Sequence, residues 1–270
     1  EFLKLEPQTE LKIKQAIKKY PQPKPIQLPK GSDVSTVNEL FTLKQKAHLG
    51  LLKHLILKNK NKNIRDSLLL AFSSTITKIN RTYHNSSSRD ENSGNASAFA
   101  YYRYRLAKET IELNVMKTFE TKIKKLIAAK NEIKNYVNDD ELLNNSSILK
   151  GTATDLSFLH NESVDYIYTD PPYGKKIPYL DLSAMWNAWL DLDVTEEDYL
   201  LEAIEGGERN KSKEEYNSLI AKSIREMYRV LKYDRWLSFV FAHKDPEFWH
   251  LIIETAQSCG FEYVGAVPQK

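Results

Sequence analysis

The feature that most constrains the fold is an apolar run that stops at two consecutive prolines. The segment VDYIYTDPPYG, from Val164 to Gly174, is typical of a buried strand followed by a turn. Proline has no backbone N–H and cannot continue a strand ladder, so the strand must end at Asp170. In an open α/β sheet, ligands bind at the carboxyl edge of the strands. The stretch Asp170–Tyr173 therefore offers a carboxylate, free carbonyls and an aromatic ring, the features that hold a planar amine.

The pattern of the chain after Ser146 alternates between strands and helices. Because such alternation is typical of a doubly wound parallel sheet, the fold class predicted for this part is α/β. Residues 191–215 are acidic and contain two adjacent glycines, and we predict a mobile loop there. The expected strands are 146–156, 164–170, 235–243 and 261–269, and the expected helices are 179–190, 212–232 and 245–260, the last ended by Gly260.

The first half of the chain has the spacing of amphipathic helices instead. A lysine-rich helix (1–20) is followed by a proline-rich segment, 20–31, that is typical of an extended linker. A polar stretch, 84–98, is predicted to be a mobile loop. The division expected from these patterns is 1–32 for the first helix and linker, 33–140 for a basic helical region and 141–270 for the α/β part. The further helices predicted in this half are 35–58, 64–82 and 105–137.

Charge is segregated along the chain. Residues 1–150 hold 27 Lys and Arg against 15 Asp and Glu, a balance of +12, whereas residues 151–270 hold 12 against 21, a balance of −9. A basic half favours a polyanionic partner such as nucleic acid, although lysines that decorate an ordinary helical surface give the same balance. Tyr102, Arg103 and Arg105 combine an aromatic ring with cations and are candidate nucleic-acid contacts, the alternative being aromatic packing in the helical core.

Composition excludes several classes of protein. The single cysteine, Cys259, rules out an intramolecular disulfide and a multi-cysteine zinc site, and we see no spacing of metal ligands. A secretory signal and an apolar run of membrane-spanning length are also not found, so a cytoplasmic protein without a membrane partner is expected. The chain begins at Glu1 without an initiator methionine, and we expect it to be a fragment of a longer protein.

The motif Asp170-Pro171-Pro172-Tyr173 resembles the catalytic motif of the S-adenosylmethionine-dependent amino-methyltransferases. The longer stretch TDPPYGKKIPYLDLSAMWNAWL, with ELFTLKQKAHLGLL and SLLLAFSSTITKINR upstream, is similar to a group of adenine-specific DNA methylases. This resemblance implies a partial class I, Rossmann-like methyltransferase sheet preceded by a mainly helical region. It further implies methyl transfer to an exocyclic amine of a DNA base, adenine N6 before cytosine N4, with DNA as partner. Subunits of a restriction or defence system are further candidate partners.

The resemblance also implies roles for individual residues. The Asp170 carboxylate and the Pro171 carbonyl would accept the two amine hydrogens, and Tyr173 would stack on the extruded base. Asp155 ends an expected strand, and in the resembled family an acid at this place holds the adenine of the cofactor; a turn cap is the alternative. Thr154 and Leu156 flank Asp155, Lys175 and Lys176 are candidate phosphate contacts beside the motif, and His243 either lines the pocket or caps the following helix.

One element that the resemblance implies is missing. The nine glycines contain no Gly-x-Gly, whereas these enzymes carry a glycine-rich loop at which the backbone approaches the cofactor. Two alternatives to DNA methylation therefore stay open. One is an RNA guanine-N2 methyltransferase, because some of these share the motif. The other is a noncatalytic nucleic-acid-binding module that kept the fold and lost the cofactor loop.

Overall fold

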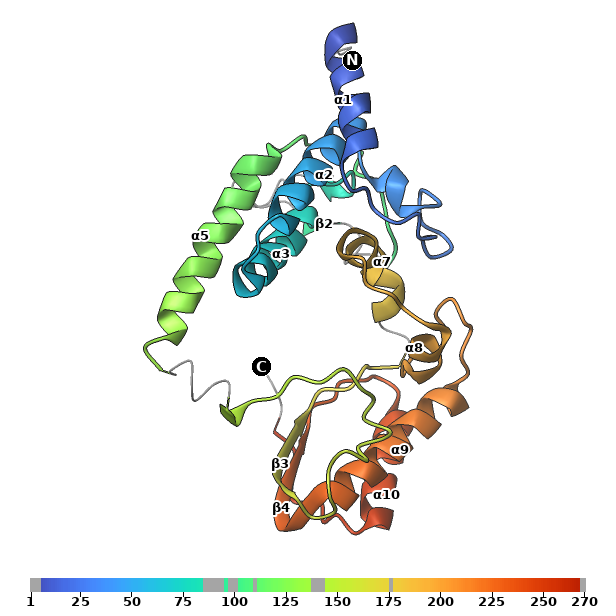
Figure 1. Cartoon of the computed structure of the whole chain (residues 1–270). Helices are drawn as coiled ribbons and strands as arrows, with labels where there is room; N and C mark the ends of the chain where they lie inside the picture. Colours follow the sequence, from blue (N-terminus) through green and yellow to red (C-terminus); the bar gives the residue numbers. More distant parts are fainter. Residues whose placement is uncertain are drawn as a thin grey trace. The chain divides into compact units, whose positions relative to one another are not determined.

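The computed structural model describes residues 6–84, 95–96, 102–108, 111–136, 144–174 and 177–267. The chain mixes helices and strands and divides into two compact units (Figure 1). The first unit comprises Glu1–Ser147 together with Leu180–Val194, and the second comprises Ile148–Tyr179 together with Thr195–Lys270. The sequence patterns did not indicate that residues 180–194, which follow the Asp-Pro-Pro-Tyr motif, belong to the helical unit.

The first unit is mainly helical. Its helices are α1 (Pro7–Lys19), the 3₁₀ helix η1 (Val37–Leu40), α2 (Leu43–Leu57), α3 (Lys62–Ile76), α5 (Val115–Ile133) and α7 (Tyr179–Leu190), and a short antiparallel pair joins β1 (Tyr83–His84) to β2 (Asn95–Ala96). Trp189 is at the centre of its core, fully buried and edge-on to Phe41 and Phe72 at ring-centroid distances of 5.5 and 5.9 Å. The buried residues of α7, which lie between Asp181 and Trp189, are thus part of the core of this unit.

The helices of this unit are shorter than the periodicity predicts, because polar side chains end or begin them. The expected helix 35–58 is divided into η1 and α2, since the Thr42 side chain accepts the Gln45 N–H and starts α2. α3 ends at Ile76 because the buried Asn80 amide donates to the Ile76 carbonyl at 2.7 Å. α5 begins only at Val115, where Asn114 caps it.

The proline-rich segment 20–31 packs on the helical unit. Pro23 and Pro29 are buried, and the Lys24 N–H donates to the Ala188 carbonyl in α7 at 3.0 Å. Gly50 in α2 leaves room for this segment, since a Cβ there would lie 2.6 Å from the Pro21 carbonyl oxygen. The segment contains no helix, as predicted, but it is a packed part of the first unit and does not act as a free spacer.

The second unit contains a two-stranded parallel sheet of β3 (Val164–Thr169) and β4 (Leu231–Phe239). Tyr166 pairs with Trp236 and Thr169 with Phe239. The helices of this unit are α8 (Glu196–Leu201), α9 (Lys213–Val230) and α10 (Pro246–Cys259), and α9 leads directly into β4. A core of buried side chains from α9, α10 and the residues just after β4 packs against Phe239 of the sheet; it comprises Tyr216, Ile220, Ile224, Phe241, Phe248 and Ile252.

Several elements of this unit agree with the sequence prediction and others differ. The strand 164–169 and the helices α7, α9 and α10 are confirmed, and Gly260 ends α10 with φ +110°. The predicted strands 146–156 and 261–269 are wrong over their described residues, where only an isolated Thr152–Asp155 bridge forms. The predicted mobile loop 191–215 is also wrong, because it contains α8, capped by Thr195, and a Gly206–Lys211 bridge. A small parallel sheet is therefore present, and the described residues do not add the further strands of a doubly wound fold to it.

The opposite face of the sheet is aromatic and exposed. Tyr166, Tyr168 and Trp236 alternate with the core-facing residues of β3 and β4 and are 55%, 64% and 61% exposed. The Tyr166 hydroxyl donates to the Ser238 hydroxyl across the two strands at 2.6 Å. None of the helices in the described part of the chain is long and apolar enough to cross a membrane.

Truncation of Phe72 tests the core around Trp189. Phe72→Ala removes a fully buried ring and should lower the free energy of unfolding by about 3–5 kcal/mol, because a cavity remains in a packed core. Leu70→Ala on the same helix is the matched control, since Leu70 is 58% exposed and its loss should cost under about 0.5 kcal/mol. Urea unfolding followed by circular dichroism measures both. Equal losses in the two variants would contradict this assignment of the core.

Candidate functional site

The Asp-Pro-Pro-Tyr motif lies at the carboxyl edge of the parallel sheet. β3 ends at Thr169, whose carbonyl still accepts the Val240 N–H from beyond β4 at 2.8 Å. Pairing stops there because Pro171 and Pro172 have no N–H to offer. The first residue of the motif, Asp170, is therefore presented at the edge of the sheet where ligands of α/β proteins bind.

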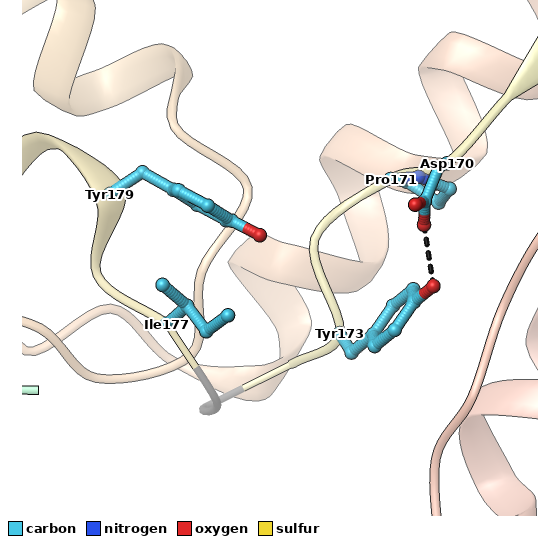
Figure 2. A pocket seen from close by; sticks show the side chains of 5 residues that line it. All are labelled: Asp170, Pro171, Tyr173, Ile177 and Tyr179. Atoms are coloured by element: carbon cyan, nitrogen blue, oxygen red, sulfur yellow. Dashed lines mark hydrogen bonds between the residues drawn. The ribbon is translucent and has the colours of Figure 1, made fainter. Parts of the chain in front are cut away.

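A small hollow of about 90 Å³ adjoins the motif, and Asp170, Pro171, Tyr173, Ile177 and Tyr179 line it. Figure 2 shows Ile177 and Tyr179 on one side of the hollow, with Asp170 and Tyr173 facing each other on the other side. The hollow combines a carboxylate with aromatic and aliphatic walls. Such a lining suits a flat ring that carries a hydrogen-bond donor.

The Asp170 carboxylate already holds a hydrogen bond within the hollow. The Tyr173 hydroxyl donates to Asp170 Oδ1 at 2.5 Å (Figure 2), and this bond raises the pKa of Tyr173 to about 12. The phenol thus remains a protonated donor at neutral pH. The Tyr173 ring packs edge-on against Phe241, with 5.2 Å between ring centroids. An amine that bonds Asp170 either shares the carboxylate with this hydroxyl or takes its place.

The turn after Asp170 packs on side chains from α9, from the segment between β4 and α10, and from α10 itself. The Tyr216 hydroxyl, from α9, donates to the Pro172 carbonyl at 2.6 Å. Gly174 has φ +61°, and a Cβ there would lie 3.2 Å from His243 Nε2 and 3.4 Å from the Phe248 ring. Both the backbone conformation and the close approach therefore require glycine at this position.

His243 is not among the residues that line the hollow, and Asp245 is the N-cap of α10, so His243 supports the segment that leads into this helix. Its Nδ1 accepts the Asp245 N–H at 3.1 Å, just before α10, and its Nε2 faces Gly174 beneath the turn. Its ring lies 4.4 Å from the Phe248 ring, edge to face. Because Nδ1 accepts a hydrogen bond, the neutral tautomer carries its proton on Nε2.

Asp155 does not meet the motif. Its Oδ1 accepts the Ser157 N–H at 2.9 Å, a bond that lowers the pKa of Asp155, so the carboxylate caps a local turn. The next residue, Leu156, donates its N–H to Glu226 on α9. Tyr216 and Glu226 are ten residues apart on this helix, which corresponds to about 15 Å along its axis. Because the strand expected to deliver Asp155 to the sheet edge does not form, Asp155 and Asp170 lie at different ends of α9.

The loop that carries Asp155 is held to the C-terminal end of α9 by a partly buried ion pair. Arg229 bonds Glu226 at 2.8 Å and donates to the carbonyls of Leu156 and Leu159 at 2.9 and 3.1 Å. Arg229 also lowers the pKa of Glu226 to about 2. Thr154 belongs to the same loop, where its hydroxyl lies 2.8 Å from that of Thr152. Leu156 and Thr154 are therefore structural members of this loop in the described chain.

The basic and aromatic candidates of the first unit bond to residues of their own unit. Arg105 pairs with Asp33 at 2.7 Å and lowers the pKa of that carboxyl, and Arg103 Nε donates to the Lys30 carbonyl at 2.8 Å. Between them, Tyr104 is fully buried and hydrogen-bonds the Leu182 carbonyl. Tyr102, half-buried with φ +53°, supplies a carbonyl to Arg103. Lys175 and Lys176 lie outside the described residues.

Three residues of the site were not identified from the sequence. Tyr216 was recognised only as part of a helix, because no local pattern shows that its hydroxyl reaches Pro172. Ile177 and Tyr179 line the hollow, and their nearness to the motif along the chain was the available signal.

The hollow suits a bound group that carries an amine, whereas the described residues do not form a second site for a methyl donor. Asp170, Pro171 and Tyr173 converge on one hollow, but Asp155 lies away from it, so the described residues assign no contact to S-adenosylmethionine. No group of three or more potential metal-binding side chains occurs among the residues with described positions. Comparison of the chain with models of protein families, with curated proteins and with solved structures gave no match.

Substitution of Gly174 tests the fit of the turn. Gly174→Ala should lower the free energy of unfolding by about 1–2 kcal/mol from the positive φ alone, with a further loss from the contact with His243. Gly206→Ala separates the two causes, because Gly206 has φ +88° but open space around its Cβ position. Gly151→Ala has neither feature and should cost nothing. Thermal unfolding of the three variants measures the order, and a Gly174→Ala loss no larger than that of Gly206→Ala would contradict the close packing.

Proposed function

We propose that this protein is an S-adenosylmethionine-dependent DNA methyltransferase that methylates an exocyclic base amine, adenine N6 in the first place. The observation that supports this most directly is the convergence of Asp170, Pro171 and Tyr173 on one hollow at the carboxyl edge of a parallel sheet. The resemblance of the motif and of its extended flanks to adenine-specific DNA methylases supports the choice of substrate.

The chemistry requires the site to make a poor nucleophile better. The lone pair of an exocyclic amine is delocalised into the base ring. When the Asp170 carboxylate and the Pro171 carbonyl accept the two N–H bonds, electron density returns to the nitrogen and its lone pair is oriented. Positioning and fixed dipoles of this kind supply much of the rate enhancement of enzymes. S-adenosylmethionine would supply the methyl group as an electrophilic sulfonium.

The base must leave the duplex to reach this site, because its amine is enclosed in the stack. Tyr173 would give up its hydrogen bond to Asp170 and place its ring against the base. The exposed ring of Tyr179, across the hollow, offers a second aromatic wall. The proposal thus assigns Asp170 and Pro171 to the amine and Tyr173 to the base plane.

Asp170→Asn tests the proposal. An amide offers a weaker acceptor and turns one end into a donor, so methyl transfer should fall by about 100-fold or more. Overall affinity for DNA should fall much less, because phosphate contacts supply most of it. Asp165→Asn is the matched control, because Asp165 is an exposed carboxylate on β3, five residues before Asp170, and it pairs with Lys232 at 2.9 Å. Transfer of labelled methyl from S-adenosylmethionine to DNA and, separately, to tRNA is measured. Normal turnover in Asp170→Asn, or transfer to tRNA alone, would refute the proposal.

A noncatalytic base-binding module is the second candidate, and one observation favours it. Asp155, the residue expected to hold the methyl donor, instead caps a turn about 15 Å along α9 from the motif. Calorimetric titration of S-adenosylmethionine into the protein separates the candidates. Binding that Asp155→Ala weakens supports the methyltransferase, whereas no binding together with retained recognition of an adenine amine supports the module.

A further inference from the structure

Tyr216 stands out among the buried tyrosines because its hydroxyl reaches the motif. The residue is 1% exposed and belongs to the apolar face of α9, where its ring packs edge-on against Phe248 at 5.2 Å. A buried hydroxyl requires a hydrogen-bond partner, and this one donates to the Pro172 carbonyl at 2.6 Å. The contact joins two segments that are 44 positions apart in the chain.

The Tyr216 phenol remains a hydrogen-bond donor at neutral pH. Burial raises the pKa of Tyr216 to about 12, and the Gly174 backbone opposes this shift only in part. The hydroxyl therefore keeps its proton and can hold the Pro172 carbonyl whether or not the hollow is occupied.

The turn has few other means of fixing its shape. Pro171 and Pro172 have φ set by their rings but cannot donate hydrogen bonds, so the strand ladder does not hold them. Their remaining freedom lies in ψ, which orients each carbonyl. Tyr216 fixes the direction of the Pro172 carbonyl, and the His243 and Phe248 rings support Gly174 from below. The direction of the preceding Pro171 carbonyl then follows from the chain geometry.

We infer that Tyr216 is a positioning residue, which holds the Asp-Pro-Pro-Tyr turn so that Asp170 and the Pro171 carbonyl face the hollow together. The inference rests on the proposed function for the role of these two acceptors. The hydrogen bond itself does not depend on what the site binds. Tyr216 acts through the Pro172 carbonyl and is not among the residues that line the hollow.

Tyr216→Phe tests the inference, with Tyr104→Phe as the matched control. Both variants keep a buried ring and lose a hydroxyl that donates to a backbone carbonyl, Pro172 in one case and Leu182 in the other. Tyr104 belongs to the first unit and Tyr216 to the second. An effect that comes only from losing a buried hydrogen bond should appear in both variants, whereas an effect on the turn should appear in Tyr216→Phe alone. The two variants should unfold at similar urea concentrations.

Two readouts follow the turn. The first is hydrogen exchange at the Gly174 amide. The second is amine recognition, taken as the ratio of affinities for labelled duplexes that carry, opposite an abasic site, either adenine or purine without its amino group. The sequence around this position is randomised, because the target sequence is not specified by the site.

The inference expects faster Gly174 exchange and a roughly tenfold smaller affinity ratio in Tyr216→Phe, while Tyr104→Phe resembles the parent in both. A parent-like ratio in Tyr216→Phe would overturn it. If the parent itself does not discriminate between the two duplexes, the proposed function fails and exchange alone decides. In that case, faster Gly174 exchange in Tyr216→Phe alone would support the positioning role of Tyr216. Equal exchange rates in the two variants would refute it.

Discussion

The organisation of the second unit depends on where the pairing of β3 and β4 stops. Parallel pairing runs to Thr169, and two residues later the chain has two consecutive positions without an N–H. This forced end turns Asp170 out at the sheet edge and sends the backbone over the His243 and Phe248 rings. The same end of the sheet receives the first turns of α9, so a hydroxyl from that helix can reach the turn. The site is thus a consequence of an interrupted ladder.

Elements with a strong local signal could be predicted from the sequence. The strand 164–169 is followed by two prolines, α10 is bounded by Asp245 and Gly260, and the α7 tryptophans have helical spacing. All three elements have the expected structure. The prediction was less accurate where one polar side chain decides a boundary, as Asn80 does after α3 and Thr42 does before α2. Capping depends on which competing hydrogen bond forms, and helical periodicity does not contain that information.

Contacts between distant segments could not be predicted. The stretch 146–156 has the composition of a strand, but a strand must pair with a neighbouring strand. The end of this segment, Leu156, instead hydrogen-bonds the Glu226 and Arg229 side chains on α9. Because of these contacts, Asp155 lies away from Asp170. Tyr216 is the opposite case, because an ordinary apolar position on a helix contacts the motif through a pairing that only the tertiary structure brings about. The motif itself was recognisable, while the residues that support it were not.

The hydrogen bond between Tyr173 and Asp170 has a consequence for the energetics of recognition. Since the carboxylate already holds the Tyr173 hydroxyl and is otherwise exposed to water, an incoming amine replaces donors that Asp170 has before the base arrives. Little net free energy is then gained at this carboxylate on binding. Affinity for a base must come from ring contacts in the hollow, whereas the exchange penalises any base that lacks a donor at the right place. Such a site discriminates between bases mainly because a base without the donor binds less well, and its affinity for the matching base is only moderate.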